Sequence, residues 1–195
     1  MKKLIYLMTI LTLSNHAFAN DGQYETYAGI RIHKNENIAF KYTTNTDDNT
    51  TVRRDSFGFG AVVGNRLSDN VKVEFESSYT GASQHNFDYD VWANMFNVYL
   101  FKEYSGTVSP YIGLGIGFAS IWGDISVSGT NISDSSFDLS MQSMLGVNFA
   151  LNDRIDFNLG VKYQYYGEIE HNEFAKTTAD ATELYFGAVY KFGLK

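Results

Sequence analysis

The sequence contains no cysteine, few basic residues and no long apolar run after residue 19. Without cysteine there is no disulfide framework, no thiolate metal site and no cysteine nucleophile. Fifteen Lys and Arg against 22 Asp and Glu give a net charge of −7, which leaves no basic footprint for nucleic acid. The absence of an apolar run of about 18 residues in 20–195 excludes a transmembrane helix there.

Residues 1–19 have the layout of a secretory signal peptide. Lys2 and Lys3 precede an apolar run from Leu4 to Leu13, and Ala17-Phe18-Ala19 supplies a small-residue cleavage site. Ten apolar residues are too few to span a bilayer, which takes about 20. We therefore predict cleavage after Ala19 and a domain over 20–195, whose net charge is −9 once the two lysines are lost from −7. An uncleaved anchor is the alternative.

Aromatic residues are abundant, with 14 Tyr and 15 Phe, and apolar residues recur at every second position. In "VKVEFESSYT" (71–80), Val71, Val73 and Phe75 alternate with Lys72 and Glu74. The same period continues to the end of the chain in "LYFGAVYKF" (184–192). Period two indicates β-strands. Eight strands are predicted, at 24–33, 55–66, 71–80, 91–103, 110–122, 136–151, 154–167 and 181–193.

The predicted connections alternate between short and long. Those at 68–70, 104–110 and 152–153 are short, whereas 34–54, 81–90, 123–135 and 168–180 are longer and polar. Short turns at one end and long loops at the other are typical of transmembrane barrels, with the short turns in the periplasm. The fold class we predict is therefore all-β, an eight-stranded antiparallel up-and-down transmembrane β-barrel.

A soluble barrel would turn its apolar faces inward, and a membrane barrel turns them outward. Glycine decides between the two, because ten strand glycines share the parity of the charged residues. A narrow lumen accepts large polar side chains only beside nearly empty positions. We predict a lumen charge network of Glu25, Arg31, Lys72, Glu74, Glu76, Glu103, Asp156, Lys162, Glu183 and Lys191. Expected pairs are Lys72 with Glu103, Arg31 with Glu183, and Lys191 with Glu25 or Asp156. Charges on a wet sheet face are the alternative.

The apolar parity predicts the aromatic girdles that mark membrane interfaces. At the long-loop end they contain Phe57, Tyr79, Trp92, Trp122, Tyr163 and Tyr165; at the short-turn end, Phe149, Tyr190 and Phe192.

Two stretches, "SPYIGLGIGFA" (109–119) and "NVYLF" (97–101), carry a family resemblance. The chain resembles the small Gram-negative outer-membrane β-barrels that include opacity-type surface proteins and the OmpX/Ail and OmpA-barrel groups, or porin-family proteins. Tyr185, Gly187, Tyr190 and Phe192 resemble the C-terminal insertion signal of such barrels. The resemblance implies an outer-membrane location. The partners that the resemblance implies are outer-membrane lipid and lipopolysaccharide, the barrel-assembly machinery during insertion, and a host surface or serum protein bound by the loops.

No catalytic, cofactor or metal site is predicted. His33, His85 and His171 are expected in or beside loops, with no paired metal motif. We predict a non-enzymatic surface protein whose external loops serve adhesion, host-factor binding or envelope integrity. One alternative is a narrow ion or small-solute channel. The other is a lipid A hydrolase that uses His85 with Ser83, or His171 with Glu173.

Overall fold

The computed structural model describes residues 25–44, 49–84, 87–104, 106–127, 130–172 and 175–192. The predicted signal peptide and the cleavage site after Ala19 lie outside these ranges. Eight strands make up the fold: β1 Thr26–Thr44, β2 Asn49–Arg66, β3 Val71–Gln84, β4 Phe87–Phe101, β5 Val108–Val127, β6 Thr130–Ala150, β7 Ile155–Asn172 and β8 Ala175–Phe192. The described residues contain no helix long and apolar enough to cross a lipid bilayer.

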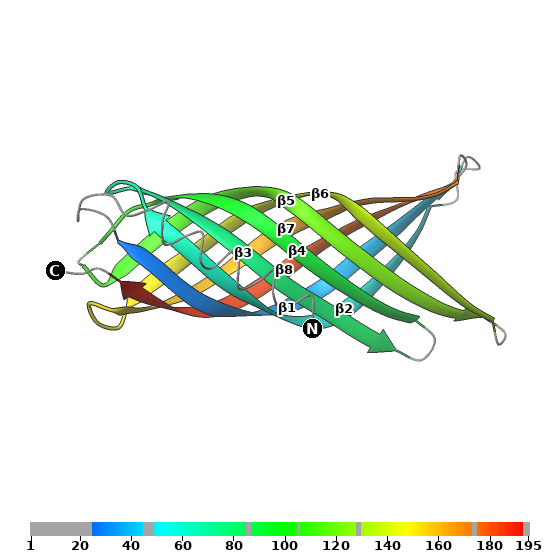
Figure 1. Ribbon diagram of the computed structural model, residues 1–195, viewed down its shortest axis with the longest axis horizontal. Helices are drawn as coiled ribbons and strands as arrows, with labels where there is room; N and C mark the ends of the chain where they lie inside the picture. Colours follow the sequence, from blue (N-terminus) through cyan, green and yellow to red (C-terminus); the bar gives the residue numbers. More distant parts are fainter. Residues whose placement is uncertain are drawn as a thin grey trace.

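The strands form a closed antiparallel barrel in sequence order (Figure 1). Closure is made by β8 against β1, with Phe192 opposite Thr26 and Gly187 opposite Arg31. The last strand therefore has a hydrogen-bonded neighbour on each side, β7 and β1. The predicted eight-stranded up-and-down barrel is confirmed.

The strands are longer than predicted. The segments 34–54, 81–90, 123–135 and 168–180 were expected as loops, but most of their residues lie in strands. For example, β1 and β2 stay paired as far as Thr43 opposite Asn49. Period two reveals a strand only where one face is apolar, and these segments are polar at most positions. Backbone hydrogen bonding continues there without that signal.

The barrel divides into two sheets at the end away from the short turns, here called the hairpin end. Pairing of β2 with β3 stops at Phe57 opposite Gly81, and pairing of β6 with β7 stops at Met141 opposite Tyr165. The other six pairs continue further, so β7-β8-β1-β2 and β3-β4-β5-β6 form separate four-stranded sheets. Figure 1 shows the two groups ending apart, at the upper and lower right.

A β-bulge marks the seam between β6 and β7. The register of β7 against β8 shifts between Tyr165 and Gly167, and Gly167 has a φ of +115°. An added Cβ at Gly167 would lie 2.3 Å from the Cβ of Asp138 in β6. Both the backbone conformation and this close approach require glycine. A bulge bends its strand, and the pairing of β7 with β6 stops at Tyr165, next to this bulge.

The two faces of the wall differ as expected for a membrane barrel. Large apolar side chains lie outside: Ile30, Phe59 and Leu114 are 67%, 61% and 70% exposed. Polar and charged side chains of the opposite parity, such as Glu74, Glu76 and Gln142, are buried inside. An apolar outer wall around a polar interior suits a protein surrounded by lipid.

Candidate functional site

Five buried charged side chains cross the lumen and form one layer, here called the charge layer: Arg31, Glu74, Glu76, Lys162 and Glu183. Arg31 Nη1 lies 2.7 Å from Glu74 Oε1 and 3.0 Å from Glu76 Oε2. Lys162 Nζ lies 3.4 Å from Glu76 Oε1 and 3.1 Å from Glu183 Oε2. Each of the five is at most 3% exposed. Such pairing is what allows charges to remain buried.

Neutral side chains complete the hydrogen bonding of this layer. Tyr99 Oη donates to Glu74 Oε1 at 2.7 Å, and Tyr27 Oη donates to Glu74 Oε2 at 3.1 Å. Asn97 donates to Glu76 at 3.3 Å, and Tyr166 donates to Glu183. The three carboxylates are thus held by hydroxyl and amide donors as well as by cations.

Two of the expected ion pairs are wrong. Arg31 does not pair with Glu183, because Gly187 is the β8 residue opposite Arg31, whereas Glu183 lies opposite Asn35. Glu183 instead faces Lys162 directly across the β7–β8 pair. The second wrong pair is Lys72 with Glu103. Glu103 pairs with Arg66 instead, and Arg66 Nη1 lies 2.8 Å from Glu103 Oε1.

Lys72 and Lys191 lie near the short-turn end of the lumen. Lys72 Nζ is surrounded by aromatic rings instead of carboxylates, with the Tyr99 and Tyr111 centroids at 4.9 and 5.0 Å. Lys191 Nζ lies between its two expected partners, 3.0 Å from Asp156 Oδ1 and 4.0 Å from Glu25 Oε2.

The expectation for His33 is also wrong. His33 lies within β1 and is fully buried, because β1 continues to Thr44. Its Nδ1 is 3.3 Å from Glu183 Oε2 and its Nε2 is 3.5 Å from Glu76 Oε1. A single histidine at a predicted strand end gave no sequence signal for this inward position.

Glycines make room for the lumen tyrosines. Tyr27 lies opposite Gly64, Tyr99 opposite Gly113, Tyr111 opposite Gly146 and Tyr185 opposite Gly160. In each case an added glycine Cβ would lie 2.3–2.5 Å from the nearest atom of the tyrosine side chain. A ring folded over a facing glycine also covers the bare backbone. The interleaving of glycine with large polar residues therefore has a direct steric cause.

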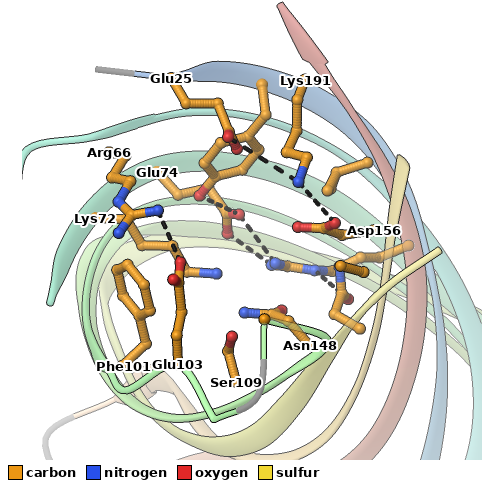
Figure 2. Close-up of a pocket in the computed structure, with 16 residues that line it drawn as sticks. Glu25, Arg66, Lys72, Glu74, Phe101, Glu103, Ser109, Asn148, Asp156 and Lys191 are labelled. Carbon is orange, nitrogen blue, oxygen red and sulfur yellow. Dashed lines mark hydrogen bonds and ion pairs between the residues drawn. The ribbon is translucent and has the colours of Figure 1, made fainter. Parts of the chain in front are cut away.

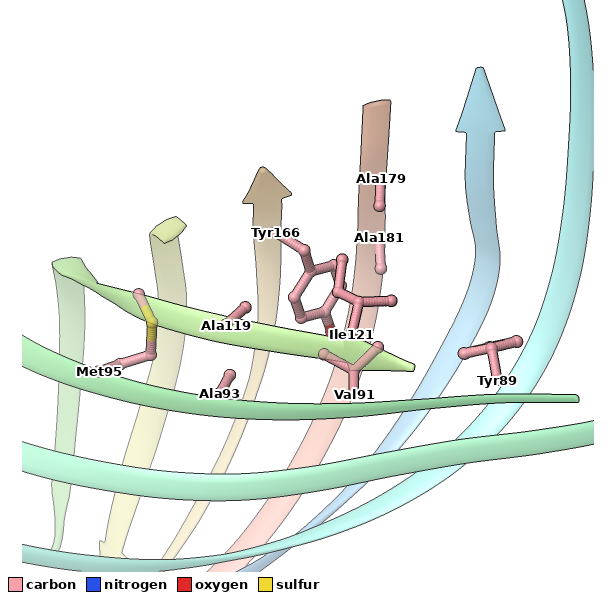
Figure 3. Close-up of a cluster of buried hydrophobic side chains, with 9 residues drawn as sticks. All are labelled: Tyr89, Val91, Ala93, Met95, Ala119, Ile121, Tyr166, Ala179 and Ala181. Carbon is pink, nitrogen blue, oxygen red and sulfur yellow. The ribbon is translucent and has the colours of Figure 1, made fainter. Parts of the chain in front are cut away.

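The hairpin half of the lumen contains an apolar cluster that the sequence reading missed. It is made of Tyr89, Val91, Ala93, Met95, Ala119, Ile121, Tyr166, Ala179 and Ala181 (Figure 3). In β4 the outward neighbours Trp92 and Phe96 are aromatic as well. Both parities are therefore apolar over part of β4, and alternation alone could not separate them.

At the short-turn end the lumen opens into a cavity of about 110 Å³ (Figure 2). Its charged lining includes Arg31, Arg66, Lys72 and Lys191 and the carboxylates Glu25, Glu74, Glu103 and Asp156. Glu25 precedes β1, and burial raises the pKa of its carboxyl above the usual range, against the opposing attraction of Lys191. No group of three or more metal-ligating side chains occurs in the described part of the chain.

The outer wall carries the residues predicted as girdles. Phe57, Trp122, Tyr163, Phe149, Tyr190 and Phe192 are exposed on it. Tyr79, Trp92 and Tyr165 are half-buried on the same face. Of the proposed insertion signal, Tyr185 and Gly187 face the lumen, while Tyr190 and Phe192 face outward with centroids 5.0 Å apart.

A closed eight-stranded barrel with an apolar wall and a packed polar lumen is the architecture of an integral outer-membrane protein. The sequence agrees, since residues 5–192 match the family described as "Outer membrane protein beta-barrel domain". The chain belongs to this family and is an outer-membrane protein. No curated protein matches it by sequence.

Solved structures agree on the fold. Neisserial surface protein A (NspA) superposes with a TM-score of 0.65 at 15% identity, covering 86% of this chain and 97% of that one. OprG from Pseudomonas aeruginosa superposes with a TM-score of 0.60 at 14% identity, covering 87% of this chain and 95% of that one. The attachment invasion locus protein Ail of Yersinia pestis, in complex with the heparin analogue sucrose octasulfate, superposes with a TM-score of 0.52 at 17% identity. The match covers 87% of this chain and 99% of that one.

Proposed function

We propose that this protein is a non-enzymatic surface barrel whose two outer sheets bind a partner outside the cell. The observation that carries the proposal is the closed lumen. The charge layer fills one part and the apolar cluster fills the next, and the described side chains of both are buried. An eight-stranded barrel has just enough interior for its own side chains. The outer surface is then the part available to a partner outside the cell.

The division of the barrel supports the same proposal. Beyond Phe57 of β2 and Met141 of β6, the strands stay paired within each of the two four-stranded sheets. Residues 130–134 of β6 lie beyond Ser135, which is opposite the girdle residue Trp122, and they pair with β5 but with no strand on their other side among the described residues. Such an edge offers backbone donors and acceptors to an extended segment of another protein.

Charge indicates what kind of partner fits. The four segments 34–54, 81–90, 123–135 and 168–180 contain eleven acidic residues and five basic ones, and four of the basic residues lie in 34–54. The Ail structure holds a sulfated polyanion, whereas these acidic segments would repel one. We therefore propose a partner with a basic surface or an extended basic segment.

The test is binding of host cells and serum proteins to bacteria that express the protein. One variant would shorten the outer sheets at paired positions, with residues 82–89 replaced by a tight turn. A matched variant would shorten 124–133 in the same way. We expect binding to fall in at least one variant and to weaken with rising salt, because the proposed attraction is electrostatic. Unchanged binding in both, with normal insertion, would contradict the proposal.

The two alternatives make separate predictions. A narrow channel would give steady ohmic current across a planar bilayer. A lipid A hydrolase would change the mass of lipid A in expressing cells, and His85→Ala or His171→Ala would restore it. His85 and Glu173 lie outside the described residues, and for Ser83 and His171 the structure describes the strand position alone.

A further inference from the structure

The cations around the short-turn cavity are not equivalent. Arg31, Arg66 and Lys191 each have a carboxylate oxygen within 3.0 Å. Among the residues that the structure describes, Lys72 has no carboxylate within 4.0 Å of its Nζ. Four ring centroids surround it instead, those of Tyr99, Tyr111, Tyr27 and Phe101, at 4.9, 5.0, 5.7 and 5.9 Å.

The rings fix the position of the amino group. Ring faces attract an ammonium without accepting its hydrogen-bond donors in the way that a carboxylate does. Lys72 lines the cavity, and Figure 2 shows its amino group extending toward the middle of it. The ammonium therefore keeps donors directed at the open space.

Two neutral side chains line the same cavity from strands further around the barrel. Ser109 in β5 and Asn148 in β6 lie opposite each other in register and both line the cavity. Neither side chain has a hydrogen-bond partner among the described residues. A hydroxyl and an amide thus accompany the lysine as unused donors, which is the chemistry that an oxyanion requires.

The carboxylates of the cavity do not oppose this arrangement equally. Glu74, Glu103 and Asp156 are each neutralised by a cation within 3.0 Å. Glu25 is the least paired, with Lys191 at 4.0 Å. Three of the four negative charges are therefore matched by Arg31, Arg66 and Lys191, which leaves Lys72 as the cation without a close carboxylate and Glu25 as the least paired carboxylate.

We propose that this cavity is a binding site for a small oxyanion, a phosphate or a carboxylate, anchored by Lys72 with Ser109 and Asn148 as further donors. The lining residues come from the short-turn ends of the strands, so the ligand enters from that mouth as a free solute. A volume of about 110 Å³ limits it to a few non-hydrogen atoms.

The test uses the whole barrel, isolated in detergent micelles, with sodium phosphate and sodium acetate as separate probes at constant ionic strength. Binding is followed by the NMR shifts of the backbone amides of Lys72, Ser109 and Asn148. We expect saturable shifts with at least one probe and none with urea, which is uncharged. The probe that saturates identifies the class of anion.

Lys72→Met keeps an unbranched side chain one atom shorter and removes its charge, and should raise the dissociation constant at least about tenfold. Lys102→Met is the matched control, because Lys102 is an exposed lysine at the same end, outside the cavity lining. It should change the constant by less than about twofold. Shifts that stay linear with both probes, or equal effects of the two variants, would overturn the proposal.

A second variant guards against loss of folding in Lys72→Met. Ser109→Ala with Asn148→Leu leaves every charge in place and removes both neutral donors. We expect weaker binding by about threefold or more, with the folded gel mobility of an unheated sample retained. Binding as tight as in the unmodified protein would show that the anion lies elsewhere.

Discussion

The two halves of the lumen are lined by side chains of the same strand parity, yet their chemistry is opposite. Toward the short turns, Arg31, Lys162 and three glutamates form an ion-paired layer. Toward the hairpins, Val91, Met95 and Ile121 form an apolar cluster. The inward face of a membrane barrel is therefore not polar throughout. The charge layer depends on pairing between strands distant in sequence, and the apolar cluster depends on shape.

The largest effect should come from breaking the charge layer. Arg31→Ala leaves Glu74 and Glu76 buried without the guanidinium that contacts both. Loss of one partner of a buried pair costs about 3–5 kcal/mol, which should lower the midpoint of urea unfolding in micelles.

The control for Arg31→Ala is Arg66→Ala. The side chains of Arg66 and Glu103 are 26% and 48% exposed, and such pairs contribute at most about 1 kcal/mol. Equal losses for the two variants would mean that the charge layer is open to water.

Truncation in the apolar cluster should come next. Met95 is fully buried, and Met→Ala in a packed interior costs about 2–5 kcal/mol. Met141 is 50% exposed on the outer wall, where lipid or detergent can fill the space, so Met141→Ala should cost clearly less in the same unfolding experiment. If the Met141 variant lost as much stability as the Met95 variant, the apolar cluster would not be a packed layer.

Overpacking one tyrosine–glycine pair should have a smaller effect. In Gly113→Ala the new Cβ would lie 2.5 Å from Tyr99 Cδ1, and Tyr99 cannot move without losing its hydrogen bond to Glu74. Overpacking of this kind costs about 1–3 kcal/mol. Ala61→Val adds methyl groups to the exposed outer wall and should change stability by less than about 0.5 kcal/mol. A neutral Gly113→Ala would contradict the steric role of the glycine.

The smallest effect should be the pH dependence contributed by Glu25. Burial raises the pKa of its carboxyl, so the folded state holds this proton more tightly than the unfolded chain. Folding stability is then lost as the pH rises through the window between the unfolded and the folded pKa. Glu25→Gln should match the unmodified protein at about pH 4 and be slightly more stable near pH 7. A variant less stable near pH 7 would mean that attraction by Lys191 outweighs burial.

Much of the architecture could be predicted from particular residues. The alternation in 71–80 placed Glu74 and Glu76 inside and Phe75 outside, and the structure agrees. The continuation of the strands to the hairpin end could not be predicted, because a strand with two polar faces has no periodic signal. The apolar cluster could not be predicted for the opposite reason. Both faces of β4 are apolar near Val91 and Trp92, so alternation does not show which face is the inner one.

The sequence by itself determined the number of strands, the inward parity of the charged side chains such as Glu74 and Glu76, and the closure of the barrel by the last strand. These follow from alternation along one chain, a local property of extended backbone. Only the tertiary structure decided that Arg31 contacts Glu74 and Glu76, that Lys162 contacts Glu183, and that Lys72 lies among four rings. Contacts across a lumen depend on the register and stagger of all eight strands together, and no single strand carries that information.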